Sequence, residues 1–134
     1  MKILLDTHII VWYFEDNKQL SQKACDIIED EANEIYYSLV SLLEVEIKHA
    51  AHPHRLSLRG EDFLSYCKEL GFIQAPLNIW HVLEVKNLTR KKNTPPHRDP
   101  FDRLMLCQAI VEDMIFITHD ERIAEYVTDC IYKV

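Results

Sequence analysis

The sequence predicts an α/β domain over residues 1–134, with a central parallel sheet of four to five strands covered by helices on both faces. Short apolar segments typical of buried strands alternate with segments of helical periodicity, which is the pattern of parallel sheets. Acidic residues follow two of these apolar segments, at the strand ends where such sheets bind ligands. The composition agrees, because 48% apolar residues with only 2 Gly and 5 Pro exclude fibrous and disordered classes.

Five short apolar segments are predicted to be strands. They cover residues 2–5, 35–39, 72–75, 114–117 and 129–132. The first is a continuous apolar run, which is typical of a strand buried on both faces. Asp6 and Asp120 each follow such a strand, so we expect both carboxylates at one edge of the sheet.

Seven segments are predicted to be helices from their apolar periodicity. They cover residues 7–14, 21–31, 41–51, 61–70, 78–89, 100–112 and 120–126. Pro53 ends the third helix, Gly71 suits the C-terminal cap of the fourth, and Pro100 suits the first turn of the sixth. Residues 90–99 are predicted to be a loop, and helix 100–112 is apolar enough to be mostly buried.

The net charge of −7 is unfavourable for a protein that contacts nucleic acid, because phosphate contacts supply most of the affinity for nucleic acids. The charge is unevenly distributed, however. Six of the 15 basic residues lie in one segment, at Lys86, Arg90, Lys91, Lys92, Arg98 and Arg103. The average charge therefore hides one basic segment, in which two basic residues flank Asp99 and Asp102, while surface solvation is the default explanation for Lys91 and Lys92.

The four cysteines, Cys25, Cys67, Cys107 and Cys130, are far apart in the sequence and form no C-x-x-C pair. Their apolar surroundings predict reduced, buried thiols. No apolar run reaches the roughly 18 residues that a membrane span requires, and a charge at position 6 interrupts any signal-peptide core. We therefore expect a cytoplasmic protein without a membrane anchor.

Each acid near a strand or helix end has a structural explanation. Ser41 and Glu44 have the spacing of a capping box, in which the glutamate binds a free backbone N–H. Thr118 and Glu121 have the same spacing, which places Asp120 in a first helical turn. Asp99 and Asp102 resemble an N-cap followed by a first-turn acid, which the helix dipole stabilises.

The acids taken together predict a metal site. Four carboxylates gathered at one edge would repel one another and raise one another's pKa unless a divalent cation lay among them. Mg²⁺ prefers oxygen ligands, and a bound Mg²⁺ can activate water for attack on phosphorus. The residues predicted to meet there are Asp6, Glu44, Asp102 and Asp120.

Four motifs resemble the signatures of PIN-domain ribonucleases. They are Leu5-Asp6-Thr7-His8, Ser41-Leu-Leu-Glu44-Val-Glu-Ile-Lys48, His97-Arg-Asp-Pro-Phe-Asp102-Arg-Leu and Ile117-Thr-His-Asp120. Their order and spacing are similar to those of the toxin component of VapBC-type toxin–antitoxin systems. The H-R-D-P-F-D-R run is the specific part of the resemblance, whereas L-D-T alone would carry little weight.

The resemblance implies a three-layer α/β/α fold and an endoribonuclease that depends on Mg²⁺ or Mn²⁺. It also implies a homodimer and an antitoxin protein that inserts a segment near the active site. Carried over by position, the catalytic and metal-holding acids are Asp6, Glu44, Asp102 and Asp120. The chain departs from this pattern after Lys48, where His-Ala-Ala-His-Pro-His-Arg replaces a glycine-containing turn, and at Cys107, a position that is more often alanine.

Several other residues are weaker candidates. Asp99, Thr7 and Thr118 are auxiliary candidates, and helix capping explains each of them equally well. Arg98 and Arg103 suit contacts with RNA phosphate or with an antitoxin carboxylate. The loop that carries Arg90, Lys91 and Lys92 is a hypothetical RNA clamp.

Three alternatives compete with the nuclease prediction. His49, His52 and His54 suggest zinc binding, although Pro53 breaks their helical geometry. Asp6 after the first strand suggests an aspartyl-phosphate, although position 8 is His where one such family needs a second acid. A non-catalytic PIN-like interaction module is the third, and the presence of all four acids argues against it.

Overall fold

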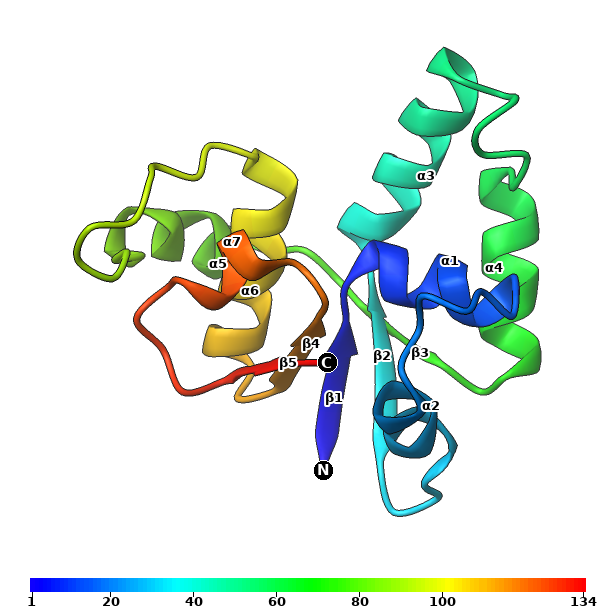
Figure 1. Ribbon diagram of the computed structural model, residues 1–134, viewed down its shortest axis with the longest axis horizontal. Coiled ribbons are helices and arrows are strands. Elements are labelled where there is room, and N and C mark those ends of the chain that lie inside the picture. The colour runs from blue at the N-terminus through cyan, green and yellow to red at the C-terminus, as the bar shows by residue number, and fades with distance from the viewer.

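The computed structural model describes residues 1–134, and its five strands form one parallel sheet in the order β3-β2-β1-β4-β5. Figure 1 shows β1 in the middle of the molecule. The strand bounds are β1 Lys2–Leu5, β2 Glu34–Ser38, β3 Ile73–Ala75, β4 Ile115–Thr118 and β5 Ile131–Lys133. All five predicted strands are present, each within two residues of its expected bounds.

Helices connect successive strands and cover both faces of the sheet. The bounds are α1 Thr7–Phe14, α2 Gln22–Glu29, α3 Leu39–Ala51, α4 Gly60–Glu69, α5 Ile79–Glu84, α6 Pro100–Val111 and α7 Glu121–Ala124. A short 3₁₀ helix, η1 (Val85–Asn87), follows α5 directly. None of these helices is long and apolar enough to cross a membrane.

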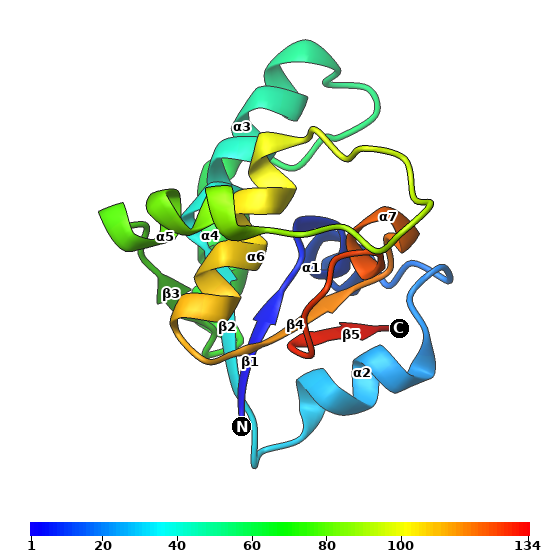
Figure 2. The same cartoon turned by 90° about the vertical axis from the view of Figure 1, so that its left-hand side faces the viewer.

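Two apolar cores make the fold a three-layer α/β/α arrangement, which confirms the predicted fold class. Alternation along β1 sends Ile3 and Leu5 into one core and Leu4 into the other. The first core packs the sheet against α1, α2 and α4, with Phe63 of α4 fully buried. The second packs it against α6, which lies in front of the strands in Figure 2.

Most helix boundaries differ from the prediction by one or two residues, and those of α3, α5 and α7 are described here. Helix α3 begins at Leu39 because Ser38, not Ser41, is its N-cap and accepts a hydrogen bond from the Val40 N–H. Helix α5 ends at Glu84, well before residue 89, and continues only as a 3₁₀ turn. Helix α7 is a single turn that begins after Asp120, because Asp120 is itself the N-cap.

The four cysteines form no disulfide bonds. All four are free, as predicted. Cys67 and Cys107 are fully buried, whereas Cys25 and Cys130 are partly exposed. Burial raises the pKa of the Cys67 and Cys107 thiols to about 12, so both are unreactive at neutral pH.

Candidate active site

Asp6 lies directly beyond β1, at the carboxyl edge of the sheet. Its backbone N–H donates to the Ile117 carbonyl at 3.0 Å, and its side chain caps α1 by accepting from the Thr7 N–H at 2.8 Å. The second carboxylate oxygen accepts from the Thr118 hydroxyl at 2.7 Å. With 2% of its surface exposed, Asp6 is held by β1, α1 and β4 together.

Glu44 lies on the side of α3 that faces Asp6, and only 6% of its surface is exposed. Its Oε1 accepts a 2.7 Å hydrogen bond from the Thr7 hydroxyl, and its Oε2 lies 3.5 Å from Lys48 Nζ. The Ser41 hydroxyl is 2.8 Å from the Thr7 hydroxyl. Because the single Thr7 proton is donated to Glu44, Ser41 is the donor in this second bond.

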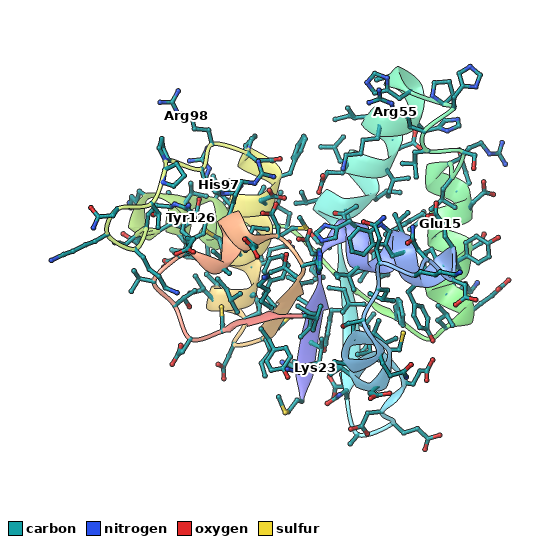
Figure 3. The ribbon with its side chains drawn as sticks, in the orientation of Figure 1. Glu15, Lys23, Arg55, His97, Arg98 and Tyr126 are labelled. Carbon is teal, nitrogen blue, oxygen red and sulfur yellow. The ribbon has the colours of Figure 1, made fainter.

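Asp102 lies in the first turn of α6, where Asp99 is the N-cap. The Asp99 carboxylate accepts from the Phe101 N–H at 2.9 Å and from the Asp102 N–H at 3.4 Å, which confirms the N-cap prediction. The Asp102 carboxyl is 3.1 Å from Nε2 of the buried His97. Nδ1 of His97 lies 2.9 Å from the Tyr126 hydroxyl, and Figure 3 shows these two side chains on the α6 side of the sheet.

Asp120 caps α7 and is more exposed than the other three acids. Its oxygens accept hydrogen bonds from the Arg122 guanidinium at 2.9 and 3.2 Å. Partial burial acts to raise the pKa of Asp120, but the hydrogen bonds and charge of Arg122 outweigh it and lower the pKa. Asp120 is therefore ionised, and Arg122 is its counter-ion.

The three buried acids carry strongly perturbed pKa values. Burial raises the pKa of Asp6 to about 6, against the opposing hydrogen bonds from Thr118 and Thr7. Burial also raises the pKa of Glu44. The pKa of Asp102 rises to about 8, first through burial and then through the negative charges of nearby carboxylates, which belong to Asp6, Asp99, Glu44 and Asp120.

Two threonines bring the acids into one region: Thr7 contacts Asp6, Glu44 and Met105 of α6, one turn beyond Asp102, and Thr118 binds Asp6 and the Asp120 N–H. Four carboxyls from four separate elements repel one another across it, and Lys48 and Arg122 compensate only two of them directly. The donor set suits a hard divalent cation, whose charge would offset the repulsion. As placed, however, no three Asp, Glu, His or Cys side chains form a ready ligand set.

Helix capping does not explain Glu44, Thr7 or Thr118. Ser41 is inside α3 rather than at its start, so Glu44 completes no capping box. Thr7 is the first residue of α1 and Thr118 the last residue of β4, and neither is an N-cap. Their hydroxyl groups instead bind Glu44 and Asp6, which makes both threonines supports of the acidic site.

Four residues that contact the acids were not predicted from the sequence to do so. Lys48 follows Glu44 by four positions, a spacing that signals a helical ion pair. Arg122 is two residues beyond Asp120, and His8 Nδ1 lies 3.4 Å from Asp6. No spacing in the sequence marks His97 as a partner of Asp102, because their contact depends on the path of the preceding loop.

The predicted basic loop divides into anchored and free residues. Arg90 donates to the Pro95 carbonyl at 3.1 Å and to the Arg122 carbonyl, and its guanidinium lies 4.7 Å from the centre of the Tyr126 ring. Lys91 Nζ donates to the Ala124 carbonyl at 3.2 Å. Both residues therefore fasten the loop to α7, while Lys92 and Arg98 are exposed.

The three histidines of the α3–α4 connection are not a metal-ligand set. His49 Nδ1 lies 2.9 Å from the Leu56 carbonyl and holds the connection in place. His52 and His54 are exposed. The zinc alternative therefore has no support in the structure.

Comparison with known proteins agrees with this architecture. A family model described as "PIN domain" matches residues 3–128. The VapBC2 structure from Rickettsia felis, bound to a DNA fragment from its promoter, matches 99% of this chain and 98% of its own chain at 13% identity and a TM-score of 0.67. VapBC-1 from nontypeable Haemophilus influenzae matches 93% of this chain and 92% of its own chain, at 16% identity and a TM-score of 0.59.

No curated protein matches the chain in sequence. The two structural matches are too distant in sequence to indicate more than a shared fold. The family model, by contrast, covers nearly the whole chain and all four acids of the candidate site. The chain belongs to the PIN domain family.

Proposed function

We propose that the protein is a metal-dependent endoribonuclease and the toxin of a toxin–antitoxin pair. The observation that carries this proposal is the burial of Asp6, Glu44 and Asp102 together at the carboxyl edge of a PIN-domain sheet, each with a raised pKa. A purely structural role does not explain why three acids are buried at the same edge of the sheet. Perturbed acids gathered in this way are typical of functional sites.

We assign the metal to Asp6, Glu44, Asp102 and Asp120. A bound Mg²⁺ or Mn²⁺ would supply an activated water and would screen charge on the phosphate. The chain's own residues keep the carboxylates in position: Thr7 binds Glu44, and Thr118 binds Asp6. Asp99 is a positioning residue, because it fixes the first turn of α6 from which Asp102 projects.

RNA is the proposed substrate, and exposed cations support this assignment. Figure 3 shows Arg98 on the α6 side of the molecule and Arg55 near the end of α3. Cations on both sides can hold the strand on either side of the cleaved bond. Lys92 remains a candidate for the same role. Arg90 and Lys91 are committed to the loop, and the partly buried Arg103 donates to the Arg98 carbonyl at 3.2 Å.

An antitoxin and a second copy of the chain are the proposed protein partners. The resemblance of the motifs to VapBC toxins and the shared fold with two VapBC structures support an antitoxin. Apolar side chains on α5 are largely exposed, with Ile79 at 66% and Trp80 at 63%. We assign this face to the homodimer, because exposed apolar clusters that include tryptophan are typical of interface centres.

The test is cleavage of total RNA by the purified wild type in Mg²⁺, in Mn²⁺ and in EDTA. We expect cleavage with either metal and none in EDTA, and no cleavage by a folded Asp6→Asn variant. Exposed Asp129 gives a matched control, because Asp129→Asn removes the same charge outside the site. If the wild type cuts no RNA with either metal, the protein is an interaction module rather than a nuclease.

A further inference from the structure

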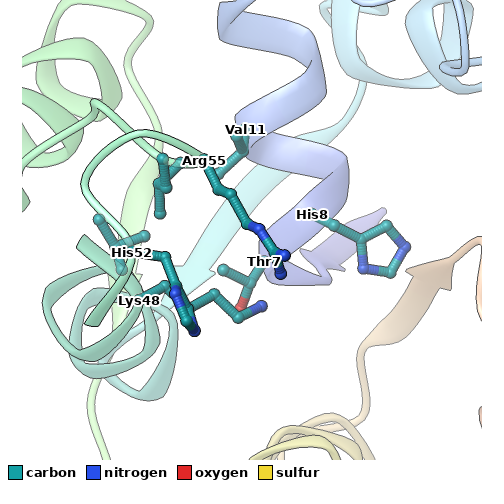
Figure 4. A pocket seen from close by; sticks show the side chains of 8 residues that line it. Thr7, His8, Val11, Lys48, His52 and Arg55 are labelled. Carbon is teal, nitrogen blue, oxygen red and sulfur yellow. The ribbon is translucent and has the colours of Figure 1, made fainter. Parts of the chain in front are cut away.

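A pocket of about 330 Å³ lies beside the acids, between α1, α3 and the connection that follows α3. Its volume falls within the range of about 300–1,000 Å³ that is usual for small-ligand sites. Val11, Val45 and Leu56 form its apolar wall, and Lys48, His52 and Arg55 form its basic side. Figure 4 shows the ends of Lys48 and Arg55 pointing toward Thr7.

The pocket is continuous with the acidic site through two shared residues. Thr7 lines the pocket and also donates its hydroxyl proton to Glu44 at 2.7 Å. Lys48 lines the pocket and lies 3.5 Å from the second Glu44 oxygen. A ligand in the pocket is therefore separated from Glu44 only by Thr7 and Lys48.

The charge of the pocket is opposite to that of the molecule. The chain has a net charge of −7, yet no carboxylate lines this pocket. Arg55 is exposed, and none of the chain's salt bridges or side-chain hydrogen bonds involves it. A polyanion that approaches the acids thus finds a free guanidinium directly beside them.

The α3–α4 connection builds the pocket, and its sequence is where the chain departs from the pattern of the toxins that it resembles. His49 Nδ1 lies 2.9 Å from the Leu56 carbonyl, and the Arg55 and Leu56 N–H groups donate to the His52 carbonyl at 3.0 and 3.1 Å. These bonds turn the chain back over the end of α3. The turn places Arg55 and Leu56 opposite Thr7 and Val11.

We propose that this pocket binds the nucleotide next to the cleaved phosphodiester of a single-stranded RNA. The base lies against Val11 and Leu56, and its phosphate binds Arg55 and Lys48. Single-stranded nucleotides offer an apolar ring and a phosphate together, which is the chemistry that the pocket presents. This inference rests on the proposed ribonuclease function, because a strand cut at the acids must continue into neighbouring sites.

The test is fluorescence anisotropy with a labelled single-stranded RNA hexamer in EDTA, so that binding is measured without cleavage. Arg55→Ala is compared with the wild type and with Arg59→Ala, which removes the same charge from an exposed residue outside the pocket. We expect Arg55→Ala to weaken binding roughly tenfold. The slope of log affinity against log salt should also fall by about 0.7, the value for one phosphate contact on a single strand.

Two results would overturn the proposal. One is equal RNA affinity and equal salt slope for Arg55→Ala and wild type. The other is a larger loss for a polyglutamate peptide than for RNA, which would assign the pocket to an acidic protein segment. Cleavage assays in Mn²⁺ separate RNA binding in the pocket from RNA cleavage at the acids. A wild type that binds RNA through Arg55 but does not cut it contradicts the ribonuclease function alone.

Discussion

The Thr7 hydroxyl donates a 2.7 Å hydrogen bond to Oε1 of Glu44, joining the first residue of α1 to the buried side of α3. Thr7 directly follows Asp6, so one residue links two of the proposed metal-binding acids. The Ser41 hydroxyl donates to Thr7 in turn. The Thr7 side chain therefore connects Glu44 directly to the Asp6 segment.

Thr7→Val removes this hydroxyl while keeping the size of the side chain. We expect the free energy of unfolding to fall by about 1–3 kcal/mol, because buried Ser41 and Glu44 both lose a partner. RNA cleavage should fall as well, since Glu44 is no longer held. Urea unfolding and the cleavage rate are the measurements, with Thr7→Ser as the control that keeps the hydroxyl. Equal losses in both variants would show that the methyl group, not the hydrogen bond, matters.

The raised acid pKa values predict that the metal-free protein loses stability as pH rises. A carboxyl whose pKa is higher in the folded state favours folding below its unfolded value and loses that contribution as pH rises through the folded value. Asp6 titrates near pH 6 and Asp102 near pH 8. His8 and His97 act in the opposite direction below about pH 6.5, because burial lowers both pKa values.

The useful window is therefore pH 6.5 to 8, where the two histidines are neutral in the folded state and at least half neutral in the unfolded state, so the titration of Asp102 dominates. We expect urea unfolding in EDTA to show stability falling across this window. Asp102→Asn should flatten the dependence, and added Mn²⁺ should restore stability at pH 8 because it binds only the folded acids. A wild type whose stability is constant from pH 6.5 to 8 would contradict the assigned pKa of Asp102.

The anchoring of Arg90 predicts a structural role for part of the basic loop. Arg90→Ala removes two hydrogen bonds to carbonyls and the stacking on Tyr126, and we expect a loss of about 1–2 kcal/mol of stability. Lys92→Ala, at an exposed neighbour, should leave stability unchanged. Thermal unfolding of the two variants measures this difference in stability. If Arg90→Ala unfolds like the wild type but binds RNA poorly, the residue belongs to an RNA clamp after all.

The exposed face of α5 predicts a dimer that one substitution disrupts. Trp80→Glu places a charge at the centre of the proposed contact, and we expect light scattering to show monomers where the wild type forms dimers. Val127→Glu, which alters an equally exposed apolar residue far along the chain, is the control. A wild type that is already monomeric at high concentration would remove the homodimer from the proposal.

The sheet and its layers could be predicted from the sequence because their signals are local. Each central strand is a short apolar run, and Pro53, Gly71 and Pro100 marked helix ends near where the structure has them. The start of α3 was misplaced because Ser38 and Ser41 are equally good caps by sequence. What favours Ser38 is distant in sequence, since its hydroxyl also binds the Gln108 side chain of α6.

The candidate site was predictable only in part, because contacts between residues that are distant in the sequence leave no local pattern. The four acids stand at strand and helix ends, which the sequence reveals. Their partners do not: Thr118 binds Asp6 across 112 positions, and His97 reaches Asp102 only through a loop without regular structure. The pocket beside Arg55 depends on the path of the α3–α4 connection, which no periodic pattern specifies.

Glu44→Gln tests whether the acids act by holding metal. The glutamine oxygen can still accept the Thr7 hydrogen bond, so the fold is retained, but an amide is a poor ligand for Mg²⁺. The measurement is the single-turnover rate of RNA cleavage in Mg²⁺, beside Glu69→Gln at an exposed helix end as the control. We predict that Glu44→Gln is inactive while Glu69→Gln cuts like the wild type. Full activity in a folded Glu44→Gln protein would contradict the four-acid metal site.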